Sequence, residues 1–372
     1  MHLGEILSIV HTESSLGWGG QEIRILTESA ALTARGHRVE LLCPAEARIF
    51  KEAERFGVRA TACPIAHKGP RGWWHLRRAL AERKIDVLNT HSSTDSWLSA
   101  LACATLHDPP PLVRTRHISA PLRRNPATRW LYVRATRKVV TTGERLREQL
   151  MRELGLAAAN VESVPTGIDV SRFVPGNRSK ARRETGLPDD KLIIGIVATL
   201  RSWKGHRYLI DATASLDRED VHLVIVGDGP QRDALREQVN KLRFPFRTTF
   251  AGNQNDVVPW LQSMDIFVLP SYANEGVPQA ILQAMACGLP VVSTNVGSIG
   301  EILRPDQTGL MAREKDVESL IANIARLCDA PELRDRIGRT ARTFVVGKYS
   351  TENMADAMER VFRVVVAGGT IR

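Results

Sequence analysis

The sequence predicts an α/β protein of two domains, each with a parallel β-sheet and crossover helices. At 372 residues the chain exceeds one ordinary hydrophobic core, which suggests about two domains. Hydrophobic residues make up 43% and charged residues 25%, as in a folded protein with a sizeable core. Short apolar runs alternate with longer segments of helical period, and this rhythm is typical of parallel sheets.

The first half of the chain predicts one complete α/β domain. Its apolar runs of strand length include Ile6–Val10, Val39–Leu42, Val87–Asn89, Leu112–Val113 and Val139–Thr141. Turn-forming residues then appear at 164–169, and a polar, basic stretch follows. We therefore assign residues 1–168 to the first domain.

The alternation restarts in the second half and predicts a second domain, residues 169–351. Its strands are expected at Leu192–Ala198, Val221–Val226, Thr248–Phe250, Ile266–Leu269 and Val291–Ser293. A last helical pattern follows the second sheet, so we expect the C-terminal helix, 352–372, to join the first domain. Ligands of open α/β sheets bind beyond the carboxyl ends of the strands, so two such Rossmann-like domains facing each other would form one deep cleft.

The N-terminus and the cysteines predict a cytoplasmic protein. The first ten residues lack a basic start and are apolar for too short a stretch to form a signal peptide. No run approaches the roughly 18 apolar residues of a spanning helix, so membrane contact would be peripheral. The five cysteines have no CxxC pair and no zinc spacing, which predicts reduced core residues. A net charge of +10 indicates an anionic partner.

Two glycine turns follow predicted strands. Gly19 and Gly20 precede a helical segment, where free backbone N–H groups favour phosphate. A purely geometric role of these glycines is equally compatible with the pattern. The turn at 227–230 follows a buried strand and indicates the fold, and a tight connection explains its glycines at least as well as a ligand contact does.

The segment from 270 to 292 is far more specific. A strand ends at Leu269, a polar loop displays Glu275, and a helix is expected from about Pro278 until Gly288 ends it. The start of this helix offers backbone N–H groups to a diphosphate, beside a carboxylate that can accept hydrogen bonds from sugar hydroxyls. Gln283 lies further along the helix, where its amide can reach a ribose.

This segment resembles the retaining glycosyltransferases of family 4, which have the GT-B architecture of two Rossmann-like domains facing across a cleft. The resemblance covers nearly the whole chain and is strongest from Glu275 to Glu301. In that family a Glu, seven intervening residues and a second Glu bind the donor sugar and its ribose. The chain has Gln283 at the second position, and its amide can keep the ribose contact because it both donates and accepts.

The chain departs from the family a second time at the diphosphate. The family has an Arg five residues before a Lys that precedes Gly; here Lys204 precedes Gly205, but Thr199 occupies the Arg position. Arg201 can substitute if the strand continues through it, since residues two apart share a face. The resemblance thus implies a donor-binding set of Gly19, Gly20, Arg201, Lys204, Glu275, Gly276, Val277, Pro278 and Gln283.

The resemblance also implies a catalytic set of Glu275, His117 and Lys204. His117 and His91 both follow predicted strands, and a lone histidine there is more often a hydrogen-bonded structural residue. His117 matches the family position beside the reacting sugar. The implied chemistry is retaining transfer with no metal and no cofactor: the chain has no Asp-x-Asp motif for Mg²⁺, and cations can neutralise the leaving diphosphate instead. We expect Glu275 and Lys204 to be exposed in the cleft, so that their replacement leaves the fold unaffected.

Basic residues concentrate in the first domain, which is the acceptor side in the family. No acidic residue occurs between Asp108 and Glu144, where Arg123, Arg124 and Trp130 lie. A solvated basic face explains this cluster as well as docking on an anionic membrane or a phosphorylated glycolipid acceptor does. Nucleic acid is not expected, because no binding motif accompanies the charge.

The sequence therefore predicts a cytoplasmic hexosyltransferase, with peripheral contact to the inner face of the membrane left open. It would move a sugar from a nucleotide-diphosphate sugar to a hydroxyl acceptor, such as a lipopolysaccharide or other cell-envelope glycan precursor. Two alternatives stay open. One is a nucleotide-sugar epimerase or hydrolase of the same fold, which needs no acceptor. The other is a non-catalytic nucleotide-sugar binding protein, favoured by Gln283 and Thr199.

Overall fold

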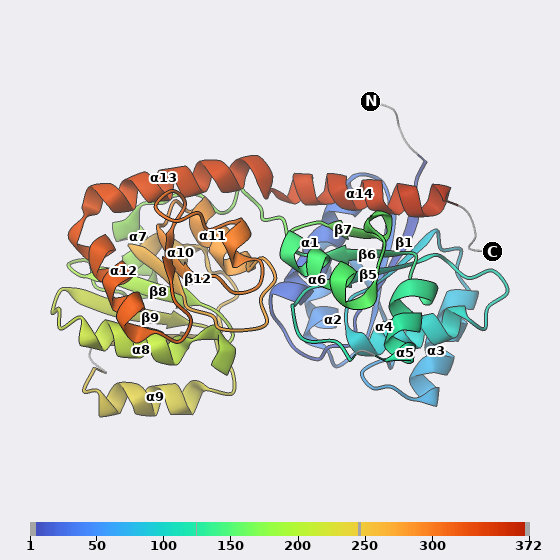
Figure 1. Ribbon diagram of the computed structural model, residues 1–372, viewed down its shortest axis with the longest axis horizontal. Helices are drawn as coiled ribbons and strands as arrows, with labels where there is room; N and C mark the ends of the chain where they lie inside the picture. The colour runs from blue at the N-terminus through green and yellow to red at the C-terminus, as the bar shows by residue number, and fades with distance from the viewer. Residues whose placement is uncertain (1–4, 124, 245–246, 369–372) are drawn as a thin grey trace. The chain divides into compact units, whose positions relative to one another are not determined.

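The chain forms two compact units in the computed structural model (Figure 1). The structure describes residues 5–123, 125–244 and 247–368. Unit 1 contains Met1–Gly167 and Thr351–Arg372, and unit 2 contains Ile168–Ser350. Each unit has one parallel sheet connected by helices, so the predicted class of an α/β protein with two Rossmann-like domains is confirmed.

Unit 1 has a seven-stranded sheet in the order β3-β2-β1-β4-β5-β6-β7. The strands are β1 (Ser8–Thr12), β2 (Arg38–Cys43), β3 (Arg59–Ala62), β4 (Val87–Thr90), β5 (Leu112–Arg116), β6 (Lys138–Thr141) and β7 (Val161–Ser163). The strand order reverses between β1 and β4, which pair in parallel with His11 opposite Asn89. The carboxyl ends of β1, β4 and β5 are therefore neighbours at the point where such sheets bind ligands.

Helices connect the strands of unit 1. They are α1 (Gly20–Ala34), α2 (Arg48–Glu52), η1 (Ala53–Phe56), α3 (Pro70–Ala81), α4 (Ser93–Cys103), α5 (Pro126–Arg129), η2 (Trp130–Ala135), α6 (Glu144–Leu154) and η3 (Ala158–Asn160). Their buried faces carry the expected helical spacing; in α6, for example, Leu146, Leu150 and Leu154 are buried at intervals of four.

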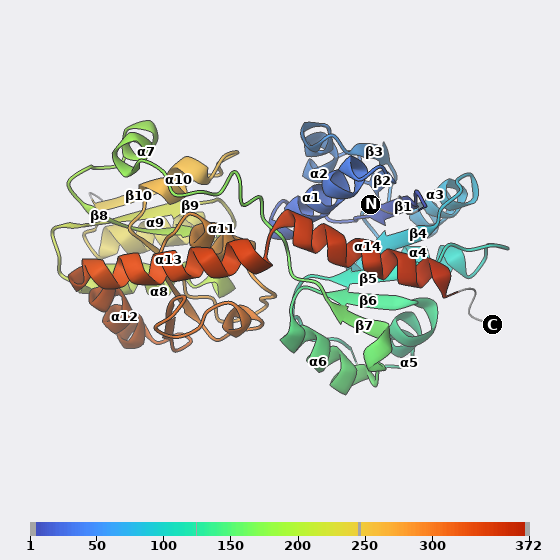
Figure 2. The same ribbon diagram turned by 90° about the horizontal axis from the view of Figure 1, so that it is seen from above.

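The C-terminal helix α14 (Thr351–Ala367) completes unit 1 by covering one face of its sheet (Figure 2). Met358, Val361 and Phe362 of α14 are buried in one core cluster with Leu7 and Ile9 from the start of the chain. The sheet would expose this apolar face without the helix, because α14 supplies five of the buried residues of the cluster.

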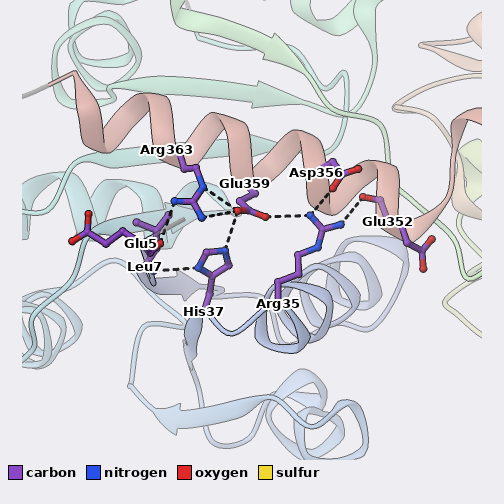
Figure 3. Close-up of polar contacts among 8 residues, drawn as sticks. All are labelled: Glu5, Leu7, Arg35, His37, Glu352, Asp356, Glu359 and Arg363. Atoms are coloured by element: carbon purple, nitrogen blue, oxygen red, sulfur yellow. Dashed lines mark hydrogen bonds and ion pairs between the residues drawn. The ribbon is translucent and has the colours of Figure 1, made fainter. Parts of the chain in front are cut away.

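Polar contacts fix the outer edge of α14 against α1 and β2 (Figure 3). The Arg35 guanidinium lies 2.7 Å from Asp356 and 3.2 Å from Glu359. Glu359 also pairs with Arg363 at 2.7 Å and lies 3.5 Å from the Nε2 atom of His37. Three contacts involve the backbone. Arg363 donates to the Glu5 carbonyl, Arg35 donates to the Glu352 carbonyl, and the Leu7 N–H donates to Nδ1 of His37.

Unit 2 has a six-stranded parallel sheet in the order β10-β9-β8-β11-β12-β13. The strands are β8 (Leu192–Val197), β9 (Val221–Val226), β10 (Thr248–Gly252), β11 (Ile266–Leu269), β12 (Val291–Thr294) and β13 (Leu310–Ala312). The helices are α7 (Arg178–Thr185), η4 (Ser202–Lys204), α8 (His206–Ser215), α9 (Arg232–Lys241), α10 (Val258–Ser263), α11 (Gln279–Ala286), η6 (Ile299–Glu301), α12 (Val317–Asp329) and α13 (Pro331–Lys348). One apolar core fills both faces of this sheet.

Three short strands escape the sequence prediction, namely β3, β7 and β13. All five cysteines are free, and Cys43, Cys63, Cys287 and Cys328 are buried, as expected of core residues. No helix within the described residues is long and apolar enough to cross a membrane.

Candidate functional site

The carboxyl edge of the unit 2 sheet brings Lys204 and Glu275 together. Lys204 ends η4, which follows β8, and Glu275 lies in the loop between β11 and α11. The Nζ atom of Lys204 lies 2.7 Å from Oε1 of Glu275, and the Ser271 hydroxyl donates to the same oxygen at 2.7 Å. Two residues that are 71 positions apart thus form one charge-assisted hydrogen bond.

Glu275 is buried, with 4% of its surface exposed, so the expectation that it lies open to solvent is wrong. The side chain of Lys204 is 21% exposed, so it is only partly accessible. A buried carboxylate needs partners, and Lys204 and Ser271 provide them on one oxygen. Replacing either member of the pair will therefore affect the local fold as well as any bound ligand.

Glycines hold both loops of this site close to neighbouring backbone. Gly205 has φ +78°, and a Cβ atom there would lie 2.0 Å from the Pro270 carbonyl oxygen. Gly297 has φ +56°, and its Cβ atom would lie 2.0 Å from the carbonyl oxygen of Glu275 itself. No larger residue fits at either position without moving the loop that carries Lys204 or Glu275.

Gly297→Ala is expected to displace the Glu275 loop, and so to lower both stability and any activity that depends on Glu275. Gly252→Ala is the matched control, because Gly252 also has a left-handed φ, +70°, but has open space around its Cβ position. Both variants carry the backbone strain of about 1 kcal/mol, and only Gly297→Ala adds the clash. Thermal unfolding of the two variants measures the difference, and equal losses would contradict the tight packing.

The helix α11 begins at Gln279, with Pro278 as its N-cap, one residue later than the sequence suggested. Gly276, Val277 and Pro278 are buried beside Glu275, and Gln283 is 8% exposed in the middle of the helix. Their roles toward a diphosphate and a ribose stay predictions.

The geometric argument for Arg201 fails, because β8 ends at Val197 and does not continue through it. The Arg201 N–H donates to the Thr199 carbonyl at 2.7 Å, which turns the chain, and the Arg201 guanidinium lies 5.7 Å from the Trp203 ring centre. Lys204 is therefore the cation of this segment that is held against Glu275. Phosphate binding by Arg201 stays a prediction.

The glycine turn at 227–230 has a packing role. A Cβ atom on Gly227 would lie 2.0 Å from the Ala198 carbonyl oxygen, and one on Gly229 would lie 2.8 Å from that of Leu200. These glycines therefore let the turn after β9 pack on the segment that precedes Lys204.

In unit 1 the predicted glycine turn is followed directly by Gln21, whose side chain contacts the buried carboxylate of Glu13. Gly19 is the N-cap of α1, and Gly20 is its first residue. Glu13, just after β1, accepts hydrogen bonds from the Ser15 N–H at 2.7 Å, from the Gln21 amide at 2.5 Å and from the Ser92 hydroxyl. Phosphate binding at the glycines stays untested.

Asp95 lies beside Glu13 and makes a second buried acidic group. It accepts from the Thr12 hydroxyl and from the His91 N–H, each at 2.9 Å. Burial raises the pKa of Glu13 to about 8, helped by the charges of Asp95 and Glu22. Burial also raises the pKa of Asp95 to about 6, against the hydrogen bonds that it accepts. The sequence analysis missed this pair, although both residues follow the carboxyl ends of strands.

Glu13→Gln is expected to remove the fall in the free energy of unfolding that ionisation of Glu13 causes between about pH 4.5 and pH 8. A carboxyl whose pKa is raised in the folded state contributes stability below its ordinary value of 4.5, and this contribution is lost as the pH rises through about 8. Glutamine cannot ionise. The free energy of unfolding of the variant, relative to that of the wild type, should therefore increase as the pH rises from about 4.5 to about 8. Denaturant titrations at several pH values measure this difference, and a difference independent of pH would refute the raised pKa.

His117 lies directly after β5 and belongs to a row of three buried histidines. Its Nε2 atom is 3.0 Å from Nδ1 of His91, and Nε2 of His91 is 2.9 Å from Nδ1 of His11. The exposed fractions are 9% for His117, 4% for His91 and 0% for His11. The sequence singled out His117 and His91 but not His11, which lies inside a strand.

The residues expected on the basic surface differ in exposure. Arg123 is exposed, Arg124 lies outside the described residues, and Trp130 is partly buried, with its ring stacked 6.1 Å from that of Trp97. Trp74 lies on α3 together with Arg71, Arg77 and Arg78, and it is 51% exposed. Trp74 is thus more exposed to solvent than Trp130.

Comparison with known proteins decides the family. A glycosyltransferase from Rickettsia africae has a TM-score of 0.88 at 20% identity, covering 98% of this chain and 100% of that one. The sequence model of Glycosyltransferase Family 4 matches residues 18–172, and that of Glycosyl transferases group 1 matches residues 177–344. The chain belongs to the GT-B glycosyltransferases.

Other known proteins are similar at lower coverage or identity. The D-inositol 3-phosphate glycosyltransferase of Saccharomonospora viridis is 30% identical over 69% of this chain, which spans 65% of that protein's length. An α-1,3-galactosyltransferase of Escherichia coli that uses UDP-Gal and α-D-GlcNAc-diphosphoundecaprenol is 25% identical over 77% of each chain. The Anabaena protein HepE, solved with UDP and glucose, has a TM-score of 0.87 at 19% identity and covers 96% of this chain and 99% of its own.

Proposed function

We propose that the protein is a retaining, metal-independent glycosyltransferase that moves a sugar from a nucleotide-diphosphate sugar to a hydroxyl acceptor. The Lys204–Glu275 pair carries this proposal, since it places a cation and a carboxylate 2.7 Å apart beside the start of α11. A cation and backbone N–H groups suit a diphosphate, and a carboxylate suits sugar hydroxyls. HepE was solved with UDP and glucose, which supports a donor of this class.

In the proposed reaction Lys204 stabilises the departing nucleotide diphosphate. Binding of the phosphate would draw Lys204 partly away from Glu275, which is then free to accept from the hydroxyls of the sugar. The acceptor hydroxyl attacks on the face that the diphosphate leaves, and a phosphate oxygen takes its proton. Positive charge of the protein replaces a metal ion, and no cofactor takes part. We propose in addition that His117 contacts the reacting sugar, as the resemblance to the family implies.

We propose a phosphorylated or lipid-linked acceptor, such as a cell-envelope glycan precursor, bound by unit 1. Two relatives act on acceptors of this kind, judged by their names: one on an inositol phosphate and one on a diphosphoundecaprenol lipid. The cationic side chains of unit 1 fit an anionic acceptor. Exposed Trp74, with the Arg78 guanidinium 5.8 Å from its ring, would allow peripheral contact with an anionic membrane from the cytoplasm.

Thermal unfolding with UDP, GDP, ADP, CMP and their sugar conjugates tests the donor assignment, because a ligand that binds only the folded protein raises the melting temperature. We expect a shift with one nucleotide diphosphate that is lost in Lys204→Met. The stabilising sugar nucleotide is then incubated with and without acceptor, and with a chelator. Turnover that needs an acceptor and survives the chelator supports the proposal.

Other outcomes identify the alternatives. Consumption of the donor without an acceptor would indicate an epimerase or hydrolase. Binding without turnover by any acceptor would indicate a non-catalytic binding protein. No shift with any nucleotide would refute the donor site at Lys204.

A further inference from the structure

Three neighbouring strands of unit 1 place one histidine each in a continuous row. His11 lies in β1, His91 follows β4 and His117 follows β5, and these strands are adjacent in the sheet. The rings are 5.2 Å apart at both steps, with interplanar angles of 16° and 33°. Each step joins one ring nitrogen to the next at hydrogen-bond distance, 2.9 Å and then 3.0 Å.

The row is uncharged near neutral pH. Burial lowers the pKa of His11 to about 3, and the charge of Arg24 adds to this effect. Burial also lowers the pKa of His91, helped by His11, His117 and Arg24. Burial lowers the pKa of His117 as well, helped by the charges of Arg24 and Arg114. A neutral imidazole carries one N–H group, so each ring has one donor and one acceptor.

The two hydrogen bonds couple the tautomers of all three rings. If His11 donates from Nδ1, then His91 accepts at Nε2 and donates from Nδ1, and His117 must also carry its proton on Nδ1. In the opposite arrangement every ring carries its proton on Nε2. A proton on one nitrogen of His11 thus decides which nitrogen of His117 is a donor.

The buried end of the row favours one arrangement. The Nε2 atom of His11 has no hydrogen-bond partner within the described part of the chain. An N–H group at that position would be an orphaned donor, which is rarer and more costly in protein interiors than an unused acceptor. The arrangement with protons on Nδ1 avoids this cost.

We propose that His11 and His91 are positioning residues that lock His117 in the Nδ1–H tautomer, so that His117 offers a hydrogen-bond donor to an oxygen of the sugar substrate. This inference rests on the proposed function, which places His117 beside the sugar. His11 would act through two rings, from a position that is fully buried.

A matched pair of variants at His11 tests the lock. Asparagine has an N–H group near the position of Nδ1 and can still donate to His91, whereas leucine has a similar shape and no donor. Proton–nitrogen NMR of protein labelled with ¹⁵N-histidine reads the tautomer of each ring directly, with a His117→Asn spectrum for assignment. We expect the Nδ1–H form in all three rings of the wild type, the same form of His117 in His11→Asn, and a mixture in His11→Leu.

The wild-type spectrum alone can overturn the proposal, because an Nε2–H tautomer of His117 contradicts it even if no variant folds. An unchanged tautomer of His117 in His11→Leu would also overturn it. Once the donor is known, kcat of His11→Leu should be about tenfold or more below that of His11→Asn, since a wrong histidine tautomer is strongly inhibitory. Equal kcat values would refute a role in the reaction. A locked row in a protein without turnover would refute the proposed function and leave the coupling of the three rings intact.

Discussion

Glu275→Gln is expected to lower turnover by on the order of a hundredfold, as losses of aligned charged contacts in water-poor sites do. Glutamine has nearly the shape of glutamate, so the loop between β11 and α11 keeps its volume. The amide can still accept from Ser271 on its oxygen, but it no longer carries the charge that holds Lys204 at 2.7 Å. Steady-state kinetics with the donor found by thermal unfolding measure this loss.

The double variant Lys204→Met/Glu275→Gln separates chemistry from stability. Each single variant leaves one charge without its partner. The sum of the two single losses in free energy of unfolding should therefore exceed the loss of the double variant. Activity should show no such recovery, because both groups would contact the substrate. Near-normal turnover of Glu275→Gln, in a protein that remains folded, would remove Glu275 from the site.

Arg24→Met is expected to destabilise unit 1 by about 3–5 kcal/mol, the usual cost of breaking a buried ion pair. Arg24 and Glu28 lie one turn apart on α1, 3.4 Å from each other, and both side chains are fully buried. Burial lowers the pKa of Arg24 and raises that of Glu28, so each charge depends on the other. Arg24 also donates to the Val164 carbonyl at 2.7 Å and to the Thr166 hydroxyl at 3.2 Å.

Two control variants test whether the loss of stability comes from the burial of the ion pair. Arg24→Met/Glu28→Leu removes both charges and should recover part of the loss. Arg35→Met, at the end of the same helix, breaks only partly exposed pairs with Asp356 and Glu359 and should cost no more than about 1 kcal/mol. Hydrogen exchange of peptides from α1, residues 161–167 and α14 locates the effect. Equal protection in the Arg24 and Arg35 variants would contradict the importance of the buried pair.

The sequence predicts best where strands are almost entirely apolar. Val221–Val226 and Ile266–Leu269 have the bounds that were predicted, because both strands are buried on both faces and flanked by polar turns. Arg59–Ala62 was missed because this edge strand is half exposed and lacks an apolar pattern. Val161–Ser163 and Leu310–Ala312 have three residues each, too few for a periodic signal.

The site was predictable as a set of residues and not as a geometry. The segment at Glu275 has a recognisable order of strand, loop and helix, whereas its burial depends on Lys204, 71 residues away in the chain. The histidine row depends on β1, β4 and β5 being adjacent, and strand order is not encoded in any local pattern. His11 therefore gave no signal of its own.

The position of α14 has a consequence for synthesis of the protein on the ribosome. Domains usually fold as units, with the N-terminal domain first as the chain emerges. Here the first sheet lacks the cover of Met358, Val361 and Phe362 until the end of the chain has been translated. Unit 2, made of the continuous segment Ile168–Ser350, can complete its core earlier. Nascent unit 1 would thus expose an apolar sheet face until α14 emerges, and exposed apolar surface of this kind is where chaperones can act.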